Sequence, residues 1–203
     1  MLINEQQQKQ LTEHITHWEE KTSVEFIVVI AKHSATYRHT PALLAALIAL
    51  VTPLALLNSP FWLSTFEMLL LQWVVFLLIA AVGFIPFIHR LITPKHLKHL
   101  RAGQMARVQF FSNNLHHTKN ATGLLIFISQ FEHYIEIIAD HGLCQQVDAD
   151  YWPNLVTQLR SEIKRGNTSA GIIKVIDSLG VTFSEHFPAT HRDNELPNNI
   201  VLL

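Results

Sequence analysis

A long apolar stretch between residues 41 and 92 limits what this chain can fold into. Residues 43–57 are almost entirely Leu, Ala, Ile and Val, residues 58–67 form a short polar break, and residues 68–88 are apolar again except for Gln72. A helix needs about 20 residues to cross a hydrocarbon core about 30 Å thick. Residues 68–88 meet this length, whereas residues 43–57 are short and contain Pro53. The pattern predicts a two-helix transmembrane hairpin over 41–92; the alternative is a pair of buried helices in a globular protein.

The charges around this stretch predict its orientation. The connecting loop, 58–67, contains no Lys or Arg, whereas six basic residues flank the outer ends: Lys32, Arg38, Arg90, Lys95, Lys98 and Arg101. Basic flanks stay on the cytoplasmic side of a membrane. We therefore expect both termini to be cytoplasmic. Residues 1–9 are polar with no apolar run behind them, so we expect no signal peptide.

Composition bounds the rest of the chain. About 150 residues lie outside the hairpin, enough for one compact core. The formal net charge of −1 argues against nucleic acid as a partner, because phosphates require clustered Lys and Arg. Cys144 is the single cysteine, so no disulfide framework exists within the chain.

Periodicity outside the hairpin predicts a mixed α/β fold. Apolar spacing behind a capping pair at Asn4 predicts a helix over 4–20, and apolar runs predict strands over 24–31, 124–129 and 134–139. Helical spacing recurs after 150 and after 168. The strands predicted over 124–129 and 134–139 are expected to form a β-hairpin, and the crossover that joins the first strand to the second predicts that those two are parallel. We expect an α/β/α sandwich around a small mixed sheet, with the transmembrane hairpin inserted in the first crossover. The predicted organisation is 1–40 and 93–190 for the two parts of the domain, 41–92 for the hairpin and 191–203 for a polar tail.

The segment after the hairpin has the pattern of an amphipathic helix over about 95–118. Its large apolar residues share one predicted face: Leu97, Leu100, Val108, Phe111 and Leu115. Lys95, Lys98 and Arg101 lie near its start, and anionic lipid headgroups explain them better than a catalytic role does.

Carboxylates after the third predicted strand are the best candidates for a ligand site. Asp140 is followed by His141 and Gly142, with Asp148 and Asp150 further on. Ligands collect where the strands of an α/β sheet end, and oxygen ligands suit Ca²⁺ or Mg²⁺. The simpler alternative is that Asp140 binds turn amides and Asp148 or Asp150 caps a helix. Glu25, the one charge in the first strand, is either a rim carboxylate or a ligand, and Cys144 is expected to be a small buried side chain.

Several segments together resemble the TPM-domain family, in its short bacterial branch with an internal transmembrane segment. They are 22–30 (TSVEFIVVI), 122–129 (TGLLIFIS), 135–142 (IEIIADHG), Trp152, 186–188 (HFP) and 194–197 (NELP). The resemblance implies an α/β sandwich in the bacterial inner membrane. Plant members of the family are associated with photosystem repair, acid phosphatase activity and divalent cations. Among the family's recurring polar positions the chain matches Glu25, Asp140, Asn194 and Glu195. The expected absence of a signal peptide is a departure from what is common in the family.

Two functions follow as expectations. The first is a membrane-anchored, cytoplasmic-face interaction module in membrane-protein maintenance or assembly, with the bilayer and a membrane protein as partners and Ca²⁺ or Mg²⁺ as a candidate ligand. The alternative is a divalent-metal-dependent phosphatase that uses Asp140, Asp148 and Glu25 as metal ligands. The sequence leaves open whether the protein is an enzyme.

Overall fold

The computed structural model describes residues 3–37, 39–57, 60, 63–189 and 200–203, and these form two compact units. One unit comprises Met1–Ser34 and His99–Leu203, and the other comprises Ala35–Lys98. The boundaries lie a few residues outside the predicted 41–92, since the first helix of the insert, α2 (His39–Leu57), begins before residue 41. A short helix after the hairpin, α4 (Pro86–Ile92), also packs against the hairpin helices.

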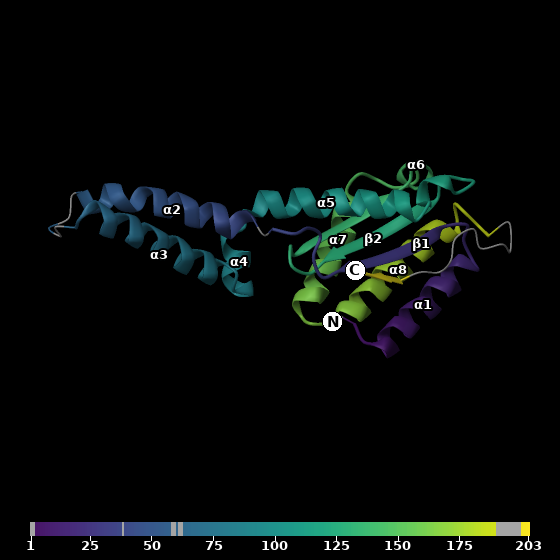
Figure 1. Cartoon of the computed structure of the whole chain (residues 1–203). Coiled ribbons are helices and arrows are strands. Elements are labelled where there is room, and N and C mark those ends of the chain that lie inside the picture. The colour runs from purple at the N-terminus through teal and green to yellow at the C-terminus, as the bar shows by residue number, and fades with distance from the viewer. Residues whose placement is uncertain (1–2, 38, 58–59, 61–62, 190–199) are drawn as a thin grey trace. The chain divides into compact units, whose positions relative to one another are not determined.

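A four-stranded mixed sheet forms the centre of the first unit (Figure 1). Its strands are β1 (Glu25–Ala31), β2 (Gly123–Ser129), β3 (Tyr134–Ala139) and β4 (Ile200–Leu202), in the order β3-β2-β1-β4. β1 pairs in parallel with β2 and β4, whereas β2 and β3 form an antiparallel pair. All residues of β1 and β2 are buried, which explains their nearly continuous apolar sequences, because a strand covered on both faces needs no polar side.

Three helices cover one face of the sheet: α1 (Glu5–Glu19), α7 (Tyr151–Lys164) and α8 (Thr168–Ser184). The capping box that starts α1 is present, since Asn4 Oδ1 accepts the Gln7 N–H at 2.8 Å and Gln7 Oε1 accepts the Asn4 N–H at 2.9 Å. Trp18 of α1 donates its indole N–H to Asp177 of α8 at 2.8 Å. Leu11 and Ile15 of α1 are fully buried in the core formed with this face of the sheet.

A single long helix, α5 (Lys95–Ser112), covers the opposite face, as Figure 1 shows for its teal ribbon above β2. Ala102, Ala106 and Phe110 pack in a second core with the β1 and β2 side chains that point to this side. The structure therefore confirms a mixed α/β fold with helices on both faces of the sheet. After α5 the chain turns through a short 3₁₀ helix, η1 (Leu115–His117).

The buried face of α5 is not the one that the sequence predicts. Ala102, Gly103, Ala106 and Phe110 are buried on the side that faces the sheet, whereas Leu100, Val108 and Phe111 are exposed. Leu115 is buried, but it belongs to η1 and not to this helix. Beside Gly103 a Cβ would lie 3.2 Å from the Tyr134 hydroxyl, so little space is left for a side chain at that point.

The last described residues also differ from the predicted polar tail. Ile200–Leu202 form β4 at the edge of the sheet beside β1. The Lys32 N–H donates to Leu203 O at 2.7 Å, and the Leu203 N–H donates to Ile30 O at 3.0 Å. The sheet thus has a fourth, short strand, an apolar run that the prediction of a polar tail passed over.

Candidate functional site

The second unit is a helical hairpin formed by α2 and α3 (Thr65–Gly83). Small residues lie where the two helices meet, since Ala45 and Ala49 are buried. At Gly83 a Cβ would lie only 2.6 Å from the Pro41 Cβ, so only glycine permits this approach. Small residues at a helix contact let two backbones approach closely, a device common in membrane helices.

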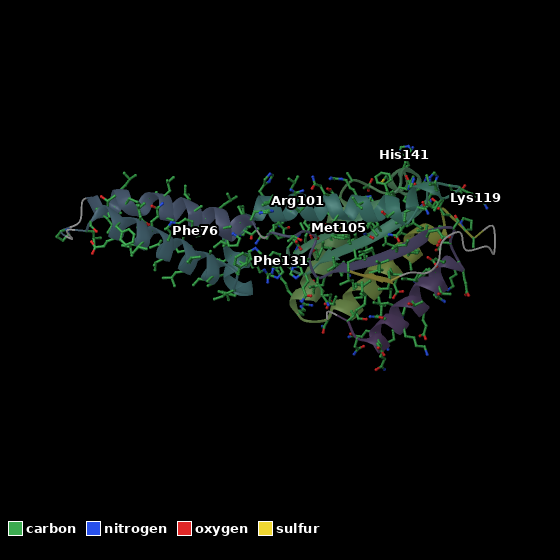
Figure 2. All side chains as sticks on the ribbon, in the orientation of Figure 1. Phe76, Arg101, Met105, Lys119, Phe131 and His141 are labelled. Carbon is green, nitrogen blue, oxygen red and sulfur yellow. The ribbon has the colours of Figure 1, made fainter. Side chains whose placement is uncertain are left out.

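Both hairpin helices are long and apolar enough to cross a membrane. The qualifying windows are His39–Leu56 and Thr65–Gly83, of which only 17% and 6% are buried within the structure. α2 reaches this length because it starts at His39 and continues through Pro53 without a break. Figure 2 shows side chains that are mostly carbon projecting outward along both helices. The two helices therefore present apolar side chains on their outer surfaces.

Charge is distributed unevenly along the hairpin unit. Glu67 is the one acidic residue between 35 and 98, and it belongs to the capping box with Ser64 at the start of α3. Glu67 lies in the first turn of α3, whereas the basic residues Arg90, Lys95 and Lys98 follow the last residue of that helix in the chain. Arg38, which precedes α2, lies outside the described residues. The Lys98 ammonium donates to Arg90 O at 3.1 Å. Arg90 Nη2 is buried without a hydrogen-bond partner among the described residues.

Glu25 and Asp140, two of the three predicted metal ligands, lie at one end of the sheet. Glu25 is the first residue of β1 and pairs with Gly123 of β2. The Asp140 N–H donates to Gly123 O at 2.9 Å from the other side. Glu25 and Asp140 are thus two strand spacings apart, about 10 Å between Cα atoms. Gly123 between them is packed against Leu115, whose carbonyl oxygen would lie 2.1 Å from an added Cβ.

This end is where β1 and β2 begin, contrary to the reasoning from the sequence. Ligands collect beyond the carboxyl ends of parallel strands. Asp140 follows the carboxyl end of β3, but β3 runs antiparallel to β2, so Asp140 lies at the starting edge of the parallel pair. There its Oδ1 accepts the His141 N–H at 2.7 Å and caps the short helix α6 (His141–Cys144), which agrees with the structural alternative.

Glu19, at the end of α1, is a buried carboxyl group at this same edge that sequence reasoning missed. Its Oε1 accepts the Phe26 N–H at 2.9 Å, whereas its Oε2 is buried without a hydrogen-bond partner in the described part of the chain. Burial raises the pKa of Glu19 to about 8, and the neighbouring Glu25 carboxylate adds to this rise while the Phe26 N–H opposes it. At neutral pH the Glu19 carboxyl group is therefore largely protonated.

The third predicted ligand lies elsewhere. Asp148 lines an open pocket of about 400 Å³ beside α7, together with Gln146, Val147, Asp150, Tyr151 and Asn154. Asp150 holds the N-cap position of α7, but its side chain makes no capping hydrogen bond. Among the described residues there is no group of three or more His, Cys, Asp or Glu side chains that could hold a metal ion. The structure thus does not gather Glu25, Asp140 and Asp148 around one point, and Asn194 and Glu195 lie outside the described residues.

A polar network occupies the opposite end of the sheet, where β1 and β2 finish. Glu132 is buried in the turn before β3, and its Oε1 accepts the Ser34 N–H at 3.0 Å. Its Oε2 accepts the Ser129 hydroxyl, and Ser129 Oγ in turn accepts the Ser34 hydroxyl at 2.7 Å. A serine bonded to a carboxylate resembles an activated nucleophile, but Ser129 is 1% exposed and no substrate can reach it. The network fixes the loop after β1 to the β2–β3 turn.

Cys144 is exposed, so the predicted buried position was wrong. Its thiol lies 3.6 Å from Ala139 O. Partial burial and, to a smaller extent, the nearby Asp140 carboxylate raise the pKa of Cys144. A raised thiol pKa lowers the fraction of thiolate, which is the nucleophilic form.

Comparisons with known proteins support the fold and add no activity. No protein-family model matches the chain, and no curated protein matches it. Among solved structures, the chain is similar to the NMR structure of the BA42 protein from the psychrophilic bacterium Bizionia argentinensis, with a TM-score of 0.59 and 17% sequence identity. That match covers 98% of this chain and 94% of BA42. At this level of identity the likeness shows a shared α/β fold alone.

Proposed function

We propose that the chain is a TPM-like α/β domain anchored in a bacterial inner membrane by the α2–α3 hairpin. In this proposal it acts at the cytoplasmic face as an interaction module in membrane-protein maintenance or assembly. The observation that carries the proposal is the exposure of the two apolar helices, because the core helices of a soluble protein would be mostly buried. Leu77 on α3, for example, is 61% exposed. Water is a poor solvent for such a surface, whereas a bilayer is a good one.

The distribution of charge supports the proposed orientation. Lys and Arg are absent from the loop at 58–67, and they flank the hairpin on both sides. A hairpin places both flanks on the same side of the membrane, and basic flanks favour the cytoplasm. The resemblance to the TPM-domain family supplies the proposed link to membrane-protein maintenance.

Membrane anchoring is tested by a matched pair of substitutions at exposed apolar residues. Leu77→Lys places a charge within α3, and Val181→Lys places the same charge on α8, where the wild-type side chain is 62% exposed. We expect the wild-type chain and Val181→Lys to resist alkaline extraction from bacterial membranes. Leu77→Lys should be extracted in larger part, because a Lys at the centre of a membrane helix costs about 2.5–3.5 kcal/mol. Complete extraction of the wild-type chain would contradict the anchor.

The orientation and the interaction are tested separately. A membrane-impermeant thiol reagent on intact spheroplasts should label Thr65→Cys, made in a Cys144→Ser background, and should leave wild-type Cys144 unlabelled; the reverse pattern would contradict cytoplasmic termini. Cross-linking in native membranes followed by purification should recover a specific membrane protein. Recovery of the chain alone, with its fold preserved, would count against an interaction module.

The alternative function is a divalent-metal-dependent phosphatase that uses Asp140, Asp148 and Glu25. Such hydrolysis requires a Lewis acid or an activated nucleophile. The described side chains do not fit a single ion held by these three residues, so the anchored module is better supported. The phosphatase proposal predicts hydrolysis of a phosphate ester that requires a divalent ion and is lost in Asp140→Asn. Activity that survives this substitution would exclude Asp140 from that role.

A further inference from the structure

The outward face of α5 carries an apolar stripe that no other described residue of its unit covers. Leu100, Val108 and Phe111 are 47%, 54% and 57% exposed, although the opposite side of the same helix is buried against the sheet. Their spacing of eight and three residues places them on one side of a helix. Burying the larger apolar side chains of an amphipathic helix is the usual arrangement. Here Leu100, Val108 and Phe111 face outward while Phe110 is buried against the sheet, so a second apolar environment is expected on the outward side.

Basic side chains border this stripe. Arg101 and Arg107 are exposed on α5, on either side of the line through Leu100, Val108 and Phe111, and Figure 2 labels Arg101 on the α5 ribbon. No Asp or Glu occurs between Glu67 and Glu132. The same segment contains six Lys or Arg residues: Arg90, Lys95, Lys98, Arg101, Arg107 and Lys119. The outward face of α5 is therefore both apolar and cationic.

This chemistry matches the surface of a bilayer that contains anionic lipids. A helix lies in the membrane interface when its apolar side chains enter the acyl boundary and its Lys and Arg side chains meet the headgroups. Continuity of the chain adds a second argument. α5 begins at Lys95, three residues after the end of α4 at Ile92, and α4 packs against the proposed membrane helices α2 and α3. The start of α5 is therefore expected near the membrane surface. A protein partner would have to supply both an apolar groove and acidic side chains, whereas anionic lipids supply both properties in one surface.

We propose that the outward face of α5 docks on anionic lipid headgroups and holds the α/β unit against the membrane. This inference rests on the proposed membrane anchor and goes beyond it. The hairpin alone would attach the α/β unit to the membrane without bringing its surface into contact with the lipids. Leu100, Val108 and Phe111 enter the interface, while Arg101 and Arg107 bind lipid phosphates on either side. The opposite face of α5 continues to cover the sheet.

The test uses the full chain with Cys144→Ser and one new cysteine that carries a polarity-sensitive fluorophore. Phe111→Cys reports the proposed docking face, Val181→Cys reports an exposed apolar position on α8, and Leu77→Cys reports the hairpin. Each protein is reconstituted in vesicles of phosphatidylcholine alone, or of phosphatidylcholine mixed with phosphatidylglycerol, that contain lipids with a quencher near the headgroup or along the acyl chain. A water-soluble quencher, used in vesicles and in detergent without lipid, measures how far each fluorophore is exposed to water.

We expect the lipids that carry a quencher near the headgroup to quench the fluorophore at Phe111→Cys strongly in the anionic vesicles and much less in the neutral ones. Adding Arg101→Gln and Arg107→Gln should lower the docked-to-undocked ratio about fivefold for each lost charge, or about 25-fold for the pair. Raising the salt concentration should lower it as well, because ions screen the contact. Val181→Cys should remain open to the water-soluble quencher throughout.

Two results would overturn the docking. One is lipid quenching at Phe111→Cys no greater than at Val181→Cys in anionic vesicles. The other is shielding of Phe111→Cys from the water-soluble quencher already in detergent, which would show that protein covers this face. Leu77→Cys distinguishes a failure of the docking from a failure of the anchor. Quenching of its fluorophore by acyl-chain quenchers in both kinds of vesicle supports the anchor whatever the result at Phe111→Cys. The absence of this quenching would contradict the anchor.

Discussion

Replacing Glu19 with glutamine should make the α/β unit more stable at neutral and alkaline pH. In the wild type the pKa of Glu19 rises from 4.5 to about 8, chiefly because the carboxyl group is buried. The folded state therefore favours the protonated form, whereas the unfolded chain loses this proton near pH 4.5. Between about pH 4.5 and about pH 8 the folded chain must either bind a proton at Glu19 or hold its buried charge. The free energy of unfolding of the wild type therefore falls as pH rises from about 4.5, and the loss is complete above about pH 8.

The size of the effect follows from the shift. Each pKa unit corresponds to 1.36 kcal/mol, so a rise of 3.5 units (8 − 4.5) gives a limit of about 5 kcal/mol in alkali and about 3 kcal/mol at pH 7. Glutamine is neutral at every pH, and its Oε1 can still accept the Phe26 N–H that Glu19 accepts at 2.9 Å. The difference in unfolding free energy between Glu19→Gln and the wild type should therefore grow by about 3 kcal/mol from about pH 5 to about pH 8.

The measurement is urea unfolding of the full chain in a non-ionic detergent over this pH range. Trp62→Phe and Trp73→Phe in every protein leave Trp18 and Trp152, both in the α/β unit, as the fluorescent reporters. Glu20→Gln is the matched control, because it removes the same charge from an exposed neighbour. A difference between Glu19→Gln and the wild type that stays constant with pH, as that of the control should, would refute the reasoning.

Two further substitutions probe packing and polar contacts in the same assay. Gly180→Ala would bring a Cβ to 2.0 Å from Trp18 Cδ2, so α8 must move away from α1, and we expect a loss of about 1–3 kcal/mol; an unchanged unfolding midpoint would contradict the close contact. Ser129→Ala removes a hydroxyl donor from the buried carboxylate of Glu132 and should also cost about 1–3 kcal/mol, whereas a stability equal to that of the wild type would show that the network does not hold the β2–β3 turn.

Local sequence signals predicted the elements of the α/β unit well. The capping box at Asn4, the apolar runs of β1 and β2, and the antiparallel β2–β3 hairpin all depend on residues close together in the chain. The parallel pairing of β1 and β2 followed from the long crossover between them. Such signals specify secondary structure directly, so these predictions were confirmed.

Predictions that depend on contacts between distant residues were less successful. The spacing of Leu100, Val108 and Phe111 suggested one buried face for α5, but the side that carries Ala102, Ala106 and Phe110 packs on the sheet. β4 is an apolar run of only three residues, too short to show a period, and nothing local in the sequence indicates that it pairs with β1. The direction of β3 placed Asp140 at the starting edge of the parallel strands, and the separation of Asp148 from Glu25 depends on where the loop after α6 runs.

The position of the hairpin in the chain also bears on how the sheet assembles. β1 ends at Ala31 and its neighbour β2 begins at Gly123, 92 positions later (123 − 31), yet the two strands pair along their full length. Closing a flexible loop of this length costs entropy, and each doubling of loop length adds about 0.6 kcal/mol. Once α2 and α3 have packed together, the stretch from His39 to Gly83 no longer counts as flexible chain. The flexible part then shrinks about twofold, which lowers the cost of bringing the strands together by about 0.6 kcal/mol. A hairpin that packs early would thus shorten the flexible connection between β1 and β2, and loosening its contact at Ala45 or Ala49 would slow the pairing of these two strands.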